Sequence, residues 1–286
     1  MNRVDILIAG GDQRQLYCAE RLSADFAAAV LGFDDEYITE DITAVKADTD
    51  SGRRYGCAVL PVVPLDSSGN VNTPCSNTAL SAAEVRGMLR PDALVFAGKA
   101  DEQLRRVFSG MEICEYLNCG ELVLRNAVPT AEGVVQIALE ELPVTINGLK
   151  VLVVGMGRCG SVIAALFRSF GADVTAAVRS GSGAAKARIA GVRAVRMEDM
   201  GADYGLVINT VPSLVFDRER LSGFGRDTLF IDIASKPGGV DMEAARELGI
   251  KAVWALGIPG RTAPVTSGEI IAETVAEKLA ERRSAK

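Results

Sequence analysis

One glycine-rich segment limits the possible folds of this chain more than any other part of its sequence does. Residues 150–154 are apolar after the first position, and the run GMGRCG follows them directly at residues 155–160. A helical segment (161–170) and a second apolar strand (173–178) complete the unit. This is G-x-G-x-x-G in the strand–turn–helix–strand setting of a dinucleotide-binding Rossmann domain, whose glycines bring backbone N–H groups close to a pyrophosphate.

The residues that follow the second strand favour NADP(H) over NAD(H). An NAD-binding domain usually has Asp or Glu there, which binds the ribose 2′-hydroxyl. Here the chain reads Val178-Arg179-Ser180, and a guanidinium suits a 2′-phosphate. The alternative is that Arg179 is a solvated loop residue, in which case NAD is the cofactor. The predicted cofactor-binding residues are Gly155, Met156, Gly157, Arg158, Cys159, Gly160, Arg179, Ser180, Thr210, Val211 and Pro212.

Alternating strands and helices on both sides of this unit predict an α/β protein with two Rossmann-like, doubly wound parallel-sheet domains. We expect residues 1–128 to form an N-terminal substrate domain, completed by a C-terminal helix, 266–286, that Ser267 caps. Residues 129–265 are expected to form the NADP-binding domain, which begins with a helix, 131–142, capped by Thr130. Residues 257–261 are expected to be a loop. The predicted strands are 4–9, 28–32, 58–63, 94–97, 150–154, 173–178, 194–196, 206–209, 229–233 and 252–256.

The composition excludes several kinds of chemistry. The chain has no histidine, so a histidine general base, a Ser–His or Cys–His couple and a histidine metal site are all ruled out. The 2-hydroxy-acid dehydrogenases usually rely on a histidine, so this chain cannot work in their way. No metal site is expected, and the six scattered cysteines are expected to be free thiols.

Charge and hydropathy limit the partners. The net charge is −6 and no basic stretch stands out, which argues against a nucleic-acid partner. No segment approaches the roughly 20 apolar residues that span a bilayer. We therefore expect a cytoplasmic protein that acts on a small molecule.

Several short motifs outside the fingerprint are uncommon among dehydrogenases. They are GGDQRQ at 10–15, PTAEG at 129–133, NTVPS at 209–213, DIASKPGG at 232–239, and Pro259-Gly260 with Ala263-Pro264. Through these motifs the chain resembles the family of dipicolinate synthase A subunits, found in spore-forming bacteria, over nearly its whole length.

The resemblance implies a reaction and partners. A hydroxylated tetrahydropyridine dicarboxylate, made in the dihydrodipicolinate synthase step, would lose water. The resulting dihydrodipicolinate-type cyclic imine would be oxidised by NADP⁺ to dipicolinate (pyridine-2,6-dicarboxylate) during sporulation. The family also works with a flavin-binding B subunit, which is a separate chain, and we expect a homo-oligomer.

A substrate with two carboxylates needs cationic or N–H partners. The predicted substrate-binding residues are Arg14, Arg261, Ser76 and Asn77. Lys236 is the leading catalytic candidate, because it follows a buried strand on the side where the nicotinamide must lie. Asp12 and Glu132 are candidates for accepting a proton during dehydration.

Each of these assignments has a structural alternative. Asp12 and Arg14 can simply cap the first helix, and Glu132 can be an ordinary acid in a first helical turn. Arg261 can be a solvated loop residue, and the polar stretch 66–77 a surface loop.

Two other functions fit the same sequence. One is another NADP-dependent dehydrogenase of similar architecture, of the amino-acid or shikimate type. The other is a non-catalytic NADP-binding regulatory protein.

Overall fold

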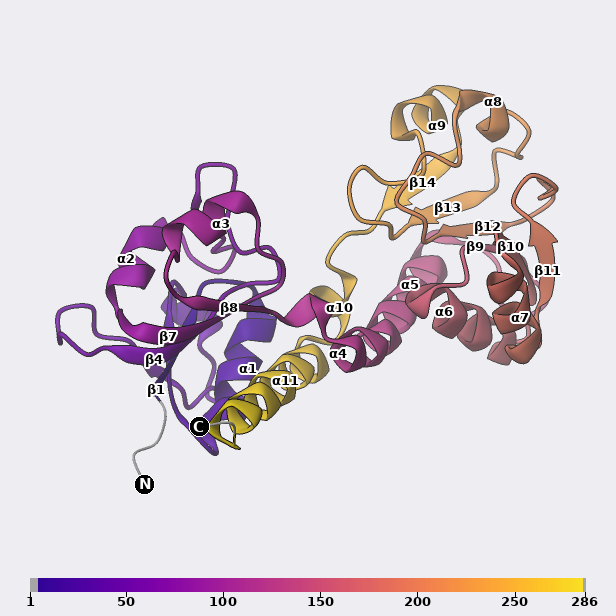
Figure 1. Ribbon diagram of the computed structural model, residues 1–286. Helices are drawn as coiled ribbons and strands as arrows, with labels where there is room; N and C mark the ends of the chain where they lie inside the picture. Colours follow the sequence, from indigo (N-terminus) through magenta and orange to yellow (C-terminus); the bar gives the residue numbers. More distant parts are fainter. Residues whose placement is uncertain (1–4, 285–286) are drawn as a thin grey trace. The chain divides into compact units, whose positions relative to one another are not determined.

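The computed structural model describes residues 5–284 of the chain (Figure 1). The chain divides into two compact units, the first made of Met1–Asn126 and Ala263–Lys286 and the second of Ala127–Thr262. Each unit is built on a six-stranded sheet whose paired strands all run parallel. This arrangement confirms the predicted fold class of two doubly wound α/β domains.

In the first unit the strand order reverses beside β1. The sheet runs β3 (Val45–Lys46), β2 (Ala27–Leu31), β1 (Asp5–Ala9), β4 (Tyr55–Val59), β7 (Leu89–Ala97) and β8 (Glu112–Glu115). The remaining elements are α1 (Gln13–Ser23), η1 (Asp35–Tyr37), β5 (Asn70–Val71), β6 (Leu80–Ser81), α2 (Ala82–Gly87), α3 (Glu102–Val107), η2 (Tyr116–Asn118), α4 (Gly120–Arg125) and α11 (Pro264–Ser284). The carboxyl ends of β1 and β4 therefore flank a switch point, where doubly wound sheets bind ligands.

The C-terminal helix α11 lies against α1 and closes the core of the first unit (Figure 1). Close approach is possible because residue 268 is glycine, and a Cβ there would lie 2.5 Å from the Arg14 carbonyl oxygen. Buried side chains of α11 (Ile270, Ile271, Val275 and Leu279) share one apolar cluster with side chains of α1. The first unit is therefore assembled from both ends of the chain.

The second unit has the same winding. Its sheet runs β11 (Arg193–Arg196), β10 (Asp173–Val178), β9 (Lys150–Val154), β12 (Leu206–Asn209), β13 (Leu229–Asp232) and β14 (Lys251–Trp254). Its helices are α5 (Ala127–Glu141), α6 (Arg158–Ser169), α7 (Gly181–Ile189), α8 (Arg218–Leu221), α9 (Met242–Leu248) and α10 (Ile258–Thr262).

Both faces of this second sheet are covered, which explains the continuous apolar run of β9. Val151 and Val153 pack into one apolar cluster, while Leu152 and Val154 pack into another. A strand buried on both faces carries apolar side chains at successive positions rather than at alternate ones. The strand order reverses between β9 and β12, so the fingerprint turn after β9 lies at this sheet's switch point.

The predicted helix starts are wrong in two places. Helix α5 begins at Ala127, so Thr130 lies inside it and is buried rather than capping it. Helix α11 begins at Pro264, so Ser267 is likewise an interior, buried residue. In each case a proline lies in the first helical turn, where its missing N–H costs nothing, and the helix extends further toward its N-terminus than the Ser/Thr signal suggests.

Two further expectations need correction. Residues 258–262 form the short helix α10 rather than a loop, and β4 ends at Val59, before Pro61. Within residues 5–284, no helix combines the length and the apolar character needed to cross a membrane.

Candidate functional site

The fingerprint turn has a tight backbone that two of its glycines make possible. Gly155 has φ +92°, and a Cβ on it would lie 2.6 Å from the Thr210 Oγ1. A Cβ on Gly160 would lie 2.0 Å from the Gly155 carbonyl oxygen. Apart from its chain neighbours, no residue of 5–284 has an atom within 4 Å of the Cβ position of Gly157. The fold thus requires Gly155 and Gly160, whereas Gly157 borders open space that a ligand can enter.

Helix α6 starts at this turn without a side-chain cap. Its N-cap is Gly157, and in the described part of the chain no side chain caps the N–H groups of the first turn. Uncapped N–H groups and the positive end of the helix dipole together favour an anion such as a phosphate. Burial raises the pKa of the neighbouring Cys159 thiol, so this residue is not a ready thiolate.

A cavity of about 270 Å³ adjoins the turn. Arg179 and Ser180 line it from the end of β10, Lys186 lines it from α7, and Val211 lines it from the loop after β12. Among residues 5–284, no carboxylate side chain lines this cavity. The predicted residues Gly155, Met156, Gly157, Arg179, Ser180 and Val211 therefore meet around one space, whereas Arg158, Cys159, Gly160, Thr210 and Pro212 are not among its lining residues.

Arg179 is anchored to neighbouring loops. Its Nη2 donates to the Ser213 Oγ at 2.9 Å, and its Nε lies 3.3 Å from the Met197 Sδ. The guanidinium is therefore held toward the loop that follows β12.

A buried carboxylate ties together the loops after β12 and β13. Asp232, 2% exposed, accepts hydrogen bonds from the Asn209 Nδ2 (2.8 Å) and from three backbone N–H groups. These N–H groups belong to Ala234 (3.0 Å), Gly239 (2.7 Å) and Val240 (3.1 Å). The Asn209 amide also donates to the Val211 carbonyl at 3.0 Å. Sequence reasoning assigns this pair no role, although Asn and Asp at the ends of neighbouring apolar strands are a usable signal.

Lys236 lies in the loop that this carboxylate fixes. Its side chain is exposed, and the Lys236–Pro237 peptide bond is cis. The indole Nε1 of Trp254 donates to the Ala234 carbonyl at 2.9 Å, which holds the same loop from β14.

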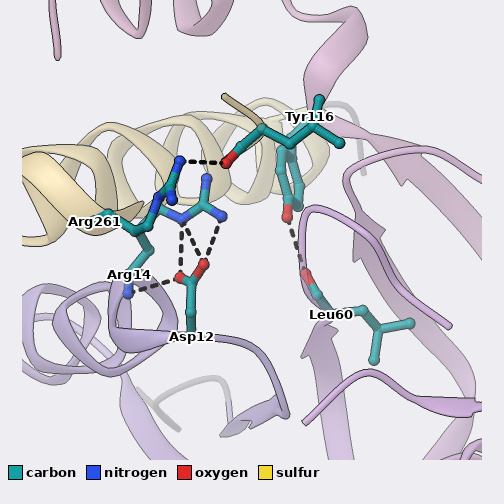
Figure 2. Close-up of polar contacts among 6 residues, drawn as sticks. Asp12, Arg14, Leu60, Tyr116 and Arg261 are labelled. Atoms are coloured by element: carbon teal, nitrogen blue, oxygen red, sulfur yellow. Dashed lines mark hydrogen bonds and ion pairs between the residues drawn. The ribbon is translucent and has the colours of Figure 1, made fainter. Parts of the chain in front are cut away.

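In the first unit, Asp12 and Arg14 form a tight pair after β1 (Figure 2). The Arg14 Nη2 lies 2.6 Å from the Asp12 Oδ2, and the Arg14 Nε lies 2.9 Å from the Asp12 Oδ1. Asp12 is also the N-cap of α1, because its carboxylate accepts the Arg14 backbone N–H. Burial lowers the pKa of Arg14, but the hydrogen bonds and charge of Asp12 outweigh it, so the pKa lies above its ordinary value.

Two buried polar residues beside this pair have no counterpart in the sequence predictions. The Tyr116 hydroxyl donates to the Leu60 carbonyl at 3.1 Å (Figure 2), and burial raises the pKa of this phenol. Gln15 is 1% exposed, and among residues 5–284 its side-chain amide has no partner of ordinary hydrogen-bond geometry. The Gln15 amide is nevertheless close enough to Tyr116 to offset part of the rise in that phenol's pKa. Gln15 ends the GGDQRQ motif at 10–15 without a role assigned to it, and Tyr116 lies in none of the motifs; both owe their burial to distant parts of the chain.

The other predicted substrate and catalytic residues are spread over separate elements. Ser76 and Asn77 both bind Asp34: the Ser76 Oγ at 2.8 Å, the Asn77 backbone N–H at 2.9 Å and the Asn77 Nδ2 at 2.8 Å. Glu132 is exposed on α5. The Nη2 of Arg261 donates from α10 to the Leu256 carbonyl at 2.9 Å (Figure 2).

Two family models match the chain. Residues 5–117 match the N-terminal domain of the dipicolinate synthase A subunit. Residues 125–244 match the NAD-binding domain of D-isomer specific 2-hydroxyacid dehydrogenases. The second unit is therefore of the type that binds a nicotinamide dinucleotide in oxidoreductases.

Whole-chain relatives extend this result. The chain is 32% identical to the A subunit of dipicolinate synthase from Bacillus subtilis (strain 168), with 96% of each chain covered. Crystal structures of the dipicolinate synthase A subunits from Bacillus halodurans and Bacillus subtilis superpose with TM-scores of 0.88 and 0.86, each at 29% identity. The alignments cover 98% of both chains in the first case, and 100% of this chain and 99% of the other in the second.

A more distant structure shares the fold alone. It is a transhydrogenase from Sinorhizobium meliloti, with a TM-score of 0.70 at 17% identity over 96% of this chain and 93% of its own. The Bacillus relatives, by contrast, match this chain in both sequence and structure over 96% or more of its length. The chain therefore belongs to the family of dipicolinate synthase A subunits.

Proposed function

We propose that this chain is an NADP-dependent oxidoreductase that converts a dihydrodipicolinate-type cyclic imine dicarboxylate to dipicolinate. The observation that carries the proposal is the cavity beside an intact fingerprint turn, lined within residues 5–284 by two cations and no acid, in a chain of this family. When bound, NADP⁺ supplies the acceptor for a hydride. The ring loses that hydride and one proton, a two-electron oxidation that makes it aromatic.

The residues around the fingerprint turn fit this cofactor. The uncapped start of α6 suits the pyrophosphate, and the open space at Gly157 lets it approach the backbone. The cationic cavity suits a 2′-phosphate, because an acid at the same place would repel it. The Asp232–Asn209 tie fixes the loops after β12 and β13, which lie at the carboxyl ends of the strands where a nicotinamide binds.

Arg14 is the substrate-binding cation that the geometry favours most. Asp12 occupies the Nε/Nη2 edge of its guanidinium, so the Nη1 edge faces away from Asp12 and can take a substrate carboxylate. Because the Asp12 oxygens are committed to Arg14 and to the cap of α1, we assign Asp12 the role of orienting Arg14. Glu132 is then the candidate for accepting the proton released during dehydration.

Lys236, Arg261, Ser76 and Asn77 complete the proposed machinery. Lys236 places an exposed ammonium on a fixed loop, where it can bind a second carboxylate and so hold the ring in position to lose its hydride. Arg261 is proposed to assist it from α10, and Ser76 and Asn77 to face the substrate from a loop pinned by Asp34. The proposal also includes the flavin-binding B subunit of the family as partner, and a homo-oligomer.

The test is a coupled assay on the full chain. The purified protein is mixed with NADP⁺ and the freshly generated product of dihydrodipicolinate synthase, and the absorbances of NADPH and of the pyridine dicarboxylate are followed together. Parallel rises, with NAD⁺ as the poorer acceptor, would support the proposal. Reduction of NADP⁺ with amino-acid or shikimate-type substrates instead would point to another dehydrogenase. Binding of NADP⁺ without turnover, even in the presence of the flavin-binding partner, would point to a regulatory protein.

A further inference from the structure

Two cationic side chains, Arg179 and Lys186, line the cavity beside the fingerprint turn, and they differ in how firmly other residues hold them. Arg179 is held by the Ser213 Oγ and the Met197 Sδ. Lys186 lies on α7 with its side chain exposed, and no carboxylate within residues 5–284 pairs with it. One cation is thus fixed in place, and the other is a mobile ammonium on a long stem.

Arg179 also lies beside two cavities. Together with Met197 it lines the 270 Å³ cavity and a second cavity of about 670 Å³, which the exposed side chain of Leu214 also lines. Arg179 therefore borders both spaces. A flat cation fixed in this way suits stacking against a purine ring.

The hydroxyl groups in the cavity are similarly divided. The Ser180 Oγ accepts the Gly183 backbone N–H at 3.2 Å and caps α7, so this hydroxyl is held in place at the helix start, although its O–H can still donate. Ser182 lines the same cavity as Lys186 and is exposed.

From this division we infer that Lys186, with Ser182, binds the 2′-phosphate of the cofactor, whereas Arg179 forms the wall against which the adenine lies. The inference rests on the proposed NADP dependence and changes its residue assignment. Lys186 then determines the preference for NADP⁺ over NAD⁺, and Arg179 contributes equally to the binding of both cofactors.

Dissociation constants of the full chain for NADP⁺ and NAD⁺, and for adenosine 2′,5′-bisphosphate and AMP as fragments, test this assignment. Lys186→Met is expected to weaken NADP⁺ and the bisphosphate by about 10-fold or more, the usual effect of losing a charge-assisted hydrogen bond, and to leave NAD⁺ and AMP nearly unchanged. Arg179→Met is expected to weaken all four ligands by similar factors. Lys186→Arg should retain most of the preference.

Arg188→Met is the matched control. Arg188 is an exposed cation on the same helix that does not line the cavity, so its loss changes the charge of the chain equally without removing a proposed contact. If Arg188→Met lowers the NADP⁺ preference as much as Lys186→Met does, the effect is one of overall charge and the inference is overturned.

Two further outcomes separate the inference from the function on which it rests. If Arg179→Met abolishes the preference and Lys186→Met does not, Arg179 binds the phosphate; the inference fails while the NADP dependence stands. If the unmodified chain binds NAD⁺ as tightly as NADP⁺, the proposed cofactor preference itself fails, and the role of Lys186 with it.

Discussion

At the residue scale, the polar groups of the candidate site differ in whether they already bind another residue of the chain. Asp12, Ser76 and Asn77 each bind another residue of their own unit, whereas Lys236 is an exposed cation on a loop held by Asp232. A fixed loop holds the backbone of an exposed lysine in place, so its ammonium stays within reach of an anionic substrate. We therefore expect substitution of Lys236 to lower the rate of turnover rather than the stability of the fold.

Lys236→Met is expected to abolish turnover and to leave the NADP⁺ dissociation constant within a few-fold of its original value. Fluorescence of Trp254, the one tryptophan of the chain, reports binding because its indole contacts the same loop. Lys150→Met serves as control, since Lys150 is exposed at the opposite end of the sheet, at the start of β9. Turnover that survives Lys236→Met would contradict the assignment.

The Asp34 carboxylate gives a pH-dependent prediction. Hydrogen bonds from the Asn77 backbone and from Ser76 lower its pKa, so the ionised form stabilises the fold above the unfolded-state pKa of about 3.9. That stabilisation is lost as the pH falls through the lower, folded-state value. The difference in melting temperature between the unmodified chain and Asp34→Ala should thus be largest near neutral pH and shrink below about pH 4. A difference that stays constant across that range would mean that the ionised carboxylate does not stabilise the loop.

At the element scale, what the sequence can predict depends on burial. Strands such as 173–178 and 206–209 are located correctly because strands buried on both faces carry long apolar runs. The edge strands β3 and β8 are missed because exposed or half-buried edge positions carry polar residues without a period. The fingerprint turn of the candidate site can be predicted because its glycines are required by the local backbone geometry. The Asn209–Asp232 tie and the place of Lys186 in the cavity depend on contacts between distant elements, which no local pattern records.

The fingerprint glycines divide into two kinds that substitution should separate. Gly160→Ala places a methyl group 2.0 Å from the Gly155 carbonyl oxygen, so it should lower the melting temperature and abolish cofactor binding together. The methyl group of Gly157→Ala meets no atom of residues 5–284 within 4 Å apart from its chain neighbours, so this variant should fold normally. It should weaken NADP⁺ and NAD⁺ binding alike, because both cofactors carry the pyrophosphate. Thermal melts and cofactor titrations of the two variants provide the comparison. Unchanged affinity in a stably folded Gly157→Ala variant would place the pyrophosphate elsewhere.

At the scale of the whole molecule, the first unit is discontinuous in sequence. Its core includes four large apolar side chains from α11, and full burial of each is worth about 1.5–3 kcal/mol. Their sum, about 6–12 kcal/mol, is comparable to the whole stability of a typical domain. The last helix is therefore a structural part of the first unit rather than an appendage.

Ending the chain after Thr262 should consequently unfold the first unit while the second remains folded. We expect fast amide exchange throughout residues 5–126 and retained protection in β9, β10 and β12, measured by hydrogen exchange with mass spectrometry. NADP⁺ should still raise the stability of the second unit, since its proposed contacts lie there. A truncated chain with a protected first sheet would show that α11 is dispensable for that unit.

The same discontinuity fixes an order of events during synthesis. A ribosome releases residues 127–262 before it releases α11, so the nucleotide-binding unit can fold while the unit begun earlier still waits for its last helix. Until α11 has been synthesised, the face of α1 that α11 covers is open to chaperones or to another nascent copy. A premature stop directly before α11 would therefore leave the first unit without its closing helix, although all of residues 5–126 had been made.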